Sequence, residues 1–134
     1  MKFTLLTLTL FILAILAVLN SGCKPVYSQG RQLFENNCGN CHGKDGLGLR
    51  SLYPPIANSD YLENNFEKLP CIITKGVHNP LTVNGKQYTT PMAGLEDLTD
   101  IEITNIVNFI SSNWYPNHEY ISLKDINVII GSCK

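Results

Sequence analysis

The sequence predicts an all-α protein of short helices that carries one small β-hairpin. The best-marked helix opens at Thr99-Asp100-Ile101-Glu102, a capping box, and apolar residues recur at helical spacing as far as Trp114. A second helical segment covers residues 27–37, and Asn84-Gly85 between two strand-like runs is typical of a type I′ hairpin turn. Loops rich in glycine and proline separate these elements, so the helices must be short.

The first helix is expected over Tyr27–Asn37, with Ser28 as its N-terminal cap. Leu33 and Phe34 supply its apolar side. Gly30, in the middle of the segment, lowers helix propensity. A glycine in that place indicates that another helix approaches closely.

The middle of the chain predicts two further short helices and the hairpin. Residues 58–68 could form one helix, and the apolar stretch 69–76 could form another. The hairpin pairs residues 81–83 with residues 86–88 across Asn84-Gly85. Pro116 ends the helix that begins at Thr99.

The segment from Ile121 to Cys133 is a tail with apolar residues and no firm assignment. So few apolar side chains for so much loop would make a weak core. We therefore expect a large apolar group at the centre of the fold.

Length and charge exclude several classes of protein. The chain has 134 residues, with ten Lys and Arg against eleven Asp and Glu. Without its apolar N-terminus it is long enough for one domain but too short for a Rossmann unit with a separate substrate domain. A mildly acidic chain without basic clusters is a poor candidate for binding nucleic acid.

The N-terminus reads as an export signal of the lipoprotein type. Lys2 precedes the apolar run Phe3–Leu19, and the small residues Ser21 and Gly22 stand directly before Cys23. We expect a signal peptide over residues 1–22, lipidation of Cys23 and a short tether over residues 23–26. An uncleaved membrane anchor and ordinary signal-peptidase cleavage are the alternatives. All three place the domain outside the cytoplasm.

The segment Cys38-Gly39-Asn40-Cys41-His42 is typical of covalent haem c attachment. Two thiols two residues apart can bond both vinyl groups of one haem, and the imidazole of His42 then ligates the iron. A redox dithiol should follow a strand, whereas a helical stretch precedes this pair. A zinc site needs a second ligand pair, which the sequence lacks.

Met92 is the predicted sixth ligand, because it is the only methionine after the N-terminal apolar run and lies in a non-helical segment behind Pro91. His78 or an open site are the alternatives. A ligating imidazole usually donates its other N–H to a fixed acceptor. The carbonyl of Pro54 is the preferred candidate, although the prolines could simply stiffen the loop. Glycines 43, 46 and 48 either bring backbone close to haem or serve as turn residues.

Taken together, the chain from Tyr27 to Trp114 resembles the class I monohaem cytochromes c. The resemblance is carried by Gly30, Phe34, the segment 38–43, Tyr53-Pro54-Pro55-Ile56-Ala57, Met92 and the helix that follows Leu98. It implies a fold in which the first and last helices cross, with Gly30 and Phe34 meeting Phe109 and Ile110. It also implies electron transfer through one haem with His42 and Met92 as axial ligands, and Pro54 as the partner of His42.

Two features depart from the family pattern. The family commonly has proline after the ligand methionine, whereas Pro91 precedes Met92 here. The hairpin around Asn84-Gly85 is an addition to the minimal fold.

Cys71 and Cys133 remain, and in an oxidising compartment they are expected to form a disulfide that ties the tail to the domain. Two separate buried thiols are the alternative. The expected organisation is therefore a cytochrome c domain over residues 27–115 and a tail over residues 116–134 packed on it.

The sequence thus predicts an exported, lipid-anchored electron carrier on the periplasmic side of a bacterial membrane, and not an enzyme. Its donor and acceptor would be redox proteins. A subunit of a larger dehydrogenase or reductase complex is one alternative, and an enzyme or gas sensor with an open sixth site is another. Lysines 44, 68, 75 and 86 either cluster around the haem edge or are scattered solvated charges.

Overall fold

The computed structural model describes residues 11–13 and 27–133. The expected lipidation site Cys23, the tether and nearly all of the expected signal peptide lie outside the described residues. Within the described part, none of the helices has both the length and the apolar composition needed to cross a bilayer.

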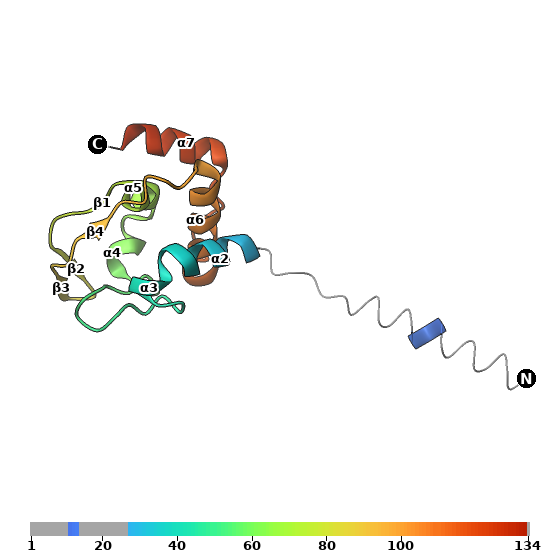
Figure 1. Cartoon of the computed structure of the whole chain (residues 1–134), viewed down its shortest axis with the longest axis horizontal. Coiled ribbons are helices and arrows are strands. Elements are labelled where there is room, and N and C mark those ends of the chain that lie inside the picture. Colours follow the sequence, from blue (N-terminus) through green and yellow to red (C-terminus); the bar gives the residue numbers. More distant parts are fainter. Residues whose placement is uncertain (1–10, 14–26, 134) are drawn as a thin grey trace, which may run out of the picture.

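Two helices that are far apart in the sequence form the frame of the domain (Figure 1). Helix α2 covers Ser28–Asn37 and the long helix α6 covers Asp100–Trp114. The predicted capping box is confirmed, because the Thr99 side chain accepts from the Glu102 N–H while the Glu102 carboxylate accepts from the Thr99 N–H. The predicted Ser28 cap is wrong: Tyr27 is the N-terminal cap, and Ser28 is already helical.

The expected crossing of α2 and α6 is confirmed, and Gly30 is the residue that allows it. A Cβ atom at Gly30 would lie 2.3 Å from the Asn105 carbonyl oxygen and 2.8 Å from the Phe109 Cβ. Next to this contact the Phe34 and Phe109 rings pack with centroids 5.3 Å apart. Hence only a residue without a side chain fits at this point of α2.

The middle of the chain forms the short helix α4 (Asp60–Glu63), the 3₁₀ turn η1 (Phe66–Lys68) and helix α5 (Leu69–Lys75). The expected single helix over residues 58–68 is therefore wrong, whereas the expected helix over 69–76 is confirmed. Asn64 and Asn65 explain the break, because their side-chain amides donate to backbone carbonyls four residues earlier at 2.8 Å. Such bonds compete with helix continuation.

Two small antiparallel strand pairs complete the fold. The predicted hairpin is confirmed as β2 (Leu81–Val83) and β3 (Lys86–Tyr88), with φ of 51° at Asn84 and 74° at Gly85 as a type I′ turn requires. The second pair, β1 (Gly76–Val77) with β4 (Met92–Ala93), was not predicted.

The tail forms helix α7 (Leu123–Ser132), capped by the Ser122 hydroxyl, which accepts from the Asp125 N–H. Figure 1 shows α7 lying across one end of the domain beside α5 and α6. Ile126 is fully buried there. A disulfide joins Cys71 of α5 to Cys133 just beyond α7, with the Cα atoms 5.5 Å apart, and closes a loop of 62 residues.

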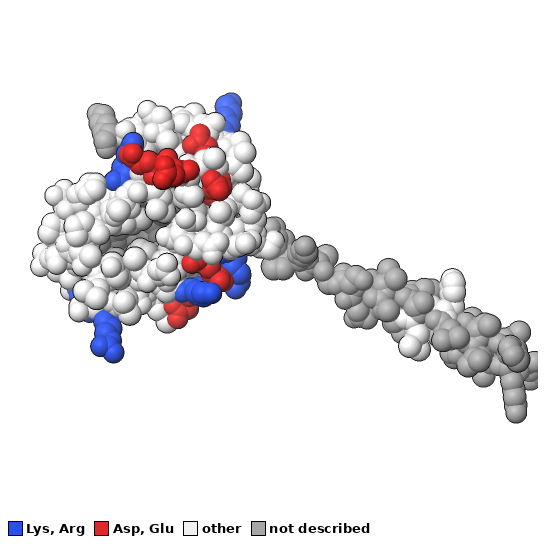
Figure 2. Space-filling model, in the orientation of Figure 1, with Lys and Arg blue, Asp and Glu red and all other residues white. Residues whose placement is uncertain are grey.

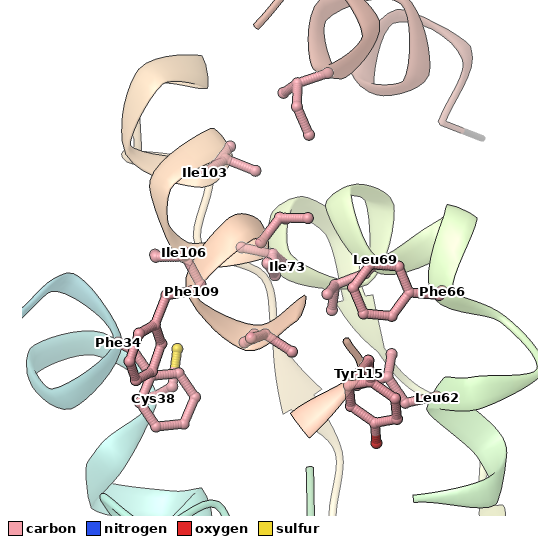
Figure 3. Packing of buried hydrophobic residues seen from close by; sticks show 13 residues of the cluster. Phe34, Cys38, Leu62, Phe66, Leu69, Ile73, Ile103, Ile106, Phe109 and Tyr115 are labelled. Atoms are coloured by element: carbon pink, nitrogen blue, oxygen red, sulfur yellow. The ribbon is translucent and has the colours of Figure 1, made fainter. Parts of the chain in front are cut away.

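One hydrophobic core runs through the domain. Figure 3 shows Phe34 and Cys38 packed beside Phe109 at one end, with Leu62 and Tyr115 at the other. Helix α6 supplies the central side chains of this core, namely Ile103, Ile106, Val107, Phe109 and Ile110. The predicted all-α fold of short helices with a small hairpin is confirmed.

Candidate haem site

The candidate site is a cavity of about 390 Å³ that brings together residues from three separate parts of the chain. Its wall includes Cys38, Cys41 and His42, then Pro54, and then Met92. Apolar side chains of α4, α5, β2 and α6 make up much of the rest, among them Leu62, Leu69, Ile73, Val83 and Ile110.

The two thiols lie where α2 passes into the short helix α3 (Gly39–His42). Cys38 is buried, Cys41 is half-buried, and neither forms a disulfide. Burial, with a smaller contribution from Cys41, raises the pKa of the Cys38 thiol to about 12. A neutral thiol that follows a helix does not fit a thioredoxin-like dithiol, whose nucleophilic cysteine has a lowered pKa.

The imidazole of His42 is buried in the cavity wall with its Nδ1 atom 2.9 Å from the Pro54 carbonyl oxygen. Burial lowers the pKa of His42, and the hydrogen bond to Pro54 opposes that shift in part. The ring is therefore neutral at neutral pH. Because a carbonyl can only accept, Nδ1 carries the proton, and the lone pair of Nε2 is left for a metal.

Met92 lies in the cavity wall beside Thr90 and Pro91, and it is the only methionine among the residues that the structure describes. His78, the alternative ligand, is not part of the wall, and its Nε2 lies 3.1 Å from the carbonyl oxygen of Lys75. Within the described residues there is also no group of three or more His, Cys, Asp and Glu that could hold a metal ion. The donor set is thus one imidazole and one thioether facing a common apolar cavity, which suits haem iron better than zinc.

Gly48 is a functional residue that sequence reasoning left undecided between two roles. Its φ is +76°, and a Cβ there would lie 2.5 Å from the Tyr53 carbonyl oxygen and 2.8 Å from that of Pro54. Gly48 therefore lets the loop close against the carbonyl that His42 uses. Its position close to two other glycines resembled ordinary turn chemistry, so no local signal could have identified this contact.

Tyr115 holds the part of this loop that follows Pro55. It was not identified from the sequence. Its hydroxyl accepts from the Ser59 N–H at 2.9 Å and donates to the Ile56 carbonyl. These bonds tie the end of α6 to the segment that follows the two prolines. An aromatic residue at the end of a helix carries no signal for such a distant partner.

The wall of the cavity is uncharged. No Lys, Arg, Asp or Glu lines it in the part of the chain that the structure describes. Figure 2 shows this hollowed face, with the border of the hollow formed by uncharged residues. Lys44 pairs with Glu35 at 3.0 Å and Lys75 with Glu96 at 3.2 Å. Lys86 lies 5.6 Å from the ring of Tyr88, which lines the cavity.

Two curated relatives are similar to most of this chain. A cytochrome c-552 of Thermus thermophilus is 29% identical over 101 residues, which is 72% of this chain and 68% of the relative. The cytochrome c subunit of the quinone-dependent alcohol dehydrogenase of Gluconobacter oxydans is 30% identical over 103 residues. That match covers 75% of this chain but only 21% of the relative.

The family model described as cytochrome c matches residues 27–114. This range holds α2 to α6 and every wall residue of the cavity. Members of this family hold haem c covalently, and the apolar cavity with its two free thiols fits such a group. The chain therefore belongs to the cytochrome c family and carries one covalently bound haem c.

Proposed function

We propose that this protein is a monohaem c-type cytochrome that transfers electrons between redox partner proteins. Cys38 and Cys41 hold the haem by thioether bonds, and His42 and Met92 are its two axial ligands. The observation that carries the proposal is that these four side chains line one apolar cavity, although Met92 is fifty residues away from His42 in sequence.

The bound haem would supply one-electron chemistry by cycling its iron between the ferric and ferrous states. The residues of this chain would then set the reduction potential of the iron. The Pro54 carbonyl, by accepting from Nδ1, orients the His42 ring and makes it a stronger ligand. The thioether of Met92 favours ferrous iron, so the reduction potential should be higher than with a second histidine.

With both axial positions filled by side chains, no coordination position is left for a substrate, so we propose an electron carrier and not an enzyme. The test is the sulfur-to-iron charge-transfer band that ferric haem shows at the red end of the visible spectrum when a thioether is bound. The folded ferric protein should show the band, and the Met92→Ala variant should lose it. A folded ferric protein without the band would favour an enzyme or sensor with an open sixth site.

We also propose export and lipid anchoring, with a signal peptide over residues 1–22 and a lipid on Cys23. The support is the sequence Ser21-Gly22-Cys23 behind an apolar run. Anchoring would raise the local concentration of the carrier near membrane-bound partners. Cys23→Ser should move the protein from the membrane fraction to the soluble one, and continued membrane association would instead support a retained helix.

A second candidate function is that of an electron-transfer subunit within a dehydrogenase complex. It is favoured by the similarity to the cytochrome c subunit of an alcohol dehydrogenase. A free carrier and a complex subunit differ in size. Size measurement after mild solubilisation of the native membrane should give a single small species for the carrier and a larger assembly for the subunit.

A further inference from the structure

Met92 is held in place by a strand pair of two residues on each side. In the register of β1 and β4, Gly76 lies opposite Ala93 and Val77 lies opposite Met92. Side chains directly opposite in an antiparallel pair share one face, and both Val77 and Met92 line the cavity. The pairing therefore decides on which face the Met92 sulfur lies.

We call the β1–β4 pair and the residues that flank it the joint. Two glycines in it let the two backbones lie closer together than side chains would allow. A Cβ atom at Gly76 would lie 2.1 Å from the Met92 carbonyl oxygen and 2.7 Å from the Gly94 nitrogen. A Cβ atom at Gly94 would lie 2.3 Å from the Thr74 carbonyl oxygen and 2.8 Å from the Lys75 carbonyl carbon. Every one of these neighbours is backbone, which cannot rotate away as a side-chain end could.

The joint is fixed to the body of the protein through α5. Beyond the strands, the Leu95 N–H donates to the Ile73 carbonyl of α5 at 2.9 Å. Ile73 itself is buried in the core, and α5 is bonded covalently to the end of α7 through Cys71. The position of β4 thus follows directly from the position of a buried helix.

From this geometry we infer that Gly76 and Gly94 are positioning residues that place the Met92 sulfur for the haem iron. The inference rests on the proposed ligand role of Met92. A side chain at either glycine forces β4 away from α5. Because a shift of one residue along a strand turns its side chains to the opposite face, even a small change of register removes Met92 from the cavity.

The chain offers a matched control for each glycine. Gly85 has a φ of +74°, almost the same as the +75° of Gly76, but a Cβ atom there meets nothing within 4 Å. Gly85→Ala therefore tests a side chain at a positive φ without the clash, whereas Gly76 also has a ψ of −170°, a backbone region that only glycine adopts readily. Gly131 in α7 is equally open, and like Gly94 it has no positive φ, so Gly131→Ala is the control for Gly94→Ala.

The test compares the four full-length, haem-loaded variants with the unchanged protein. We expect Gly76→Ala and Gly94→Ala to lose the sulfur-to-iron band in the ferric state and to show a lowered reduction potential and rapid carbon monoxide binding when ferrous. Gly85→Ala and Gly131→Ala should keep the band. Full retention of the band in both Gly76→Ala and Gly94→Ala, with helix content unchanged, overturns the inference.

A measurement on the unchanged protein decides the matter if neither glycine variant folds. Imidazole in excess displaces a thioether ligand from ferric haem. Because coupling between two sites is reciprocal, freeing Met92 should loosen the joint. The Leu95 amide should then exchange its hydrogen faster, while the Ile103 amide of α6 should not change. Equal exchange at Leu95 with and without imidazole contradicts the inference.

These outcomes separate this inference from the proposed function. If the unchanged ferric protein lacks the band, the ligand role of Met92 is wrong, and the positioning role fails with it. If the unchanged protein has the band and the Gly76 and Gly94 variants keep it, only the positioning role is wrong.

Discussion

The Nδ1 atom of His42 lies 2.9 Å from the carbonyl oxygen of Pro54, and Gly48 is the residue that leaves room for that carbonyl. The Gly48 N–H also donates to the His42 carbonyl at 2.7 Å. The loop after His42 therefore contacts the histidine at two points. Gly48 bonds the backbone carbonyl of His42, and Pro54 bonds its ring. Both contacts depend on a residue with a positive φ and no side chain.

We expect Gly48→Ala to raise the reduction potential. The new Cβ atom would press on the Pro54 carbonyl and weaken its hydrogen bond to His42, so the imidazole becomes a weaker ligand and ferric iron is less stabilised. Potentiometric titration checks this, with Gly85→Ala as the control for a side chain at a positive φ. Equal potentials for the two variants would contradict the expectation.

Tyr115→Phe should destabilise the domain by about 1–3 kcal/mol, because it leaves the Ser59 N–H and the Ile56 carbonyl without their partner. Denaturant unfolding measures the change. Tyr120→Phe is the matched control, since Tyr120 is 65% exposed, and its effect should stay within about 0.5 kcal/mol. Similar losses for both variants would show that the buried bonds of Tyr115 contribute little.

Stability at alkaline pH should also depend on Tyr115. Burial raises the pKa of this hydroxyl in the folded protein above its ordinary value of 10.0. The folded state therefore holds the proton of Tyr115 more tightly than the unfolded state. The resulting contribution to the free energy of unfolding is complete below pH about 10 and is lost as the pH rises through the folded-state pKa. The free energy of unfolding should fall less steeply above pH about 10 in Tyr115→Phe than in the unchanged protein. If the free energy of unfolding falls equally steeply with pH in both proteins, Tyr115 does not cause the alkaline loss of stability.

Substitution of alanine for two helical glycines should have opposite effects. Alanine improves helix propensity by about 1 kcal/mol at either position. At Gly30 the new Cβ would meet the Asn105 carbonyl at 2.3 Å, and overpacking of about 1–3 kcal/mol outweighs the gain. At Gly131 it meets nothing within 4 Å. Urea unfolding should show Gly30→Ala destabilised and Gly131→Ala stabilised. A gain of stability in both variants would mean that α2 can move away from α6 at no cost.

Removal of the Cys71–Cys133 disulfide should cost about 4 kcal/mol in the chain-entropy treatment, since the bond closes a loop of 62 residues. The double variant Cys71→Ser with Cys133→Ser leaves no free thiol from the pair. Its unfolding midpoint in denaturant should fall clearly below that of the unchanged protein. Mass spectrometry without reductant should show the unchanged protein lighter by two hydrogens than after reduction, and equal masses would exclude the bond.

The parts of the fold that sequence predicts well are those that depend on neighbouring residues. The capping box of Thr99 and Glu102 needs residues three positions apart, and the Asn84-Gly85 turn needs two adjacent ones. Both are confirmed. The helix over residues 58–68 was wrong because two asparagine side chains compete with the helix for backbone carbonyls, which propensity alone does not reveal.

The parts that could not be predicted depend on distant contacts. The β1–β4 pair is only two residues long on each side, and its cause is a close approach between Gly76 and Gly94 across a long loop. The local pattern of helix α7, a Ser122 cap followed by apolar residues at helical spacing, was not recognised. What depends on distant contacts there is the burial of Ile126 against α5 and α6. The haem-binding segment could be read directly, but the cavity that receives the haem is made by residues far from it in sequence.

The disulfide between α5 and α7 makes oxidative folding of this chain depend on delivery of the cofactor. The described residues hold four cysteines, and four thiols can pair in several ways. Once the proposed thioethers occupy Cys38 and Cys41 and the proposed lipid occupies Cys23, oxidation of the remaining two cysteines would have a single product, the bond between Cys71 and Cys133. A chain oxidised before it receives haem can instead form mispaired isomers. Covalent attachment at one end of the domain thus selects the correct cross-link at the other.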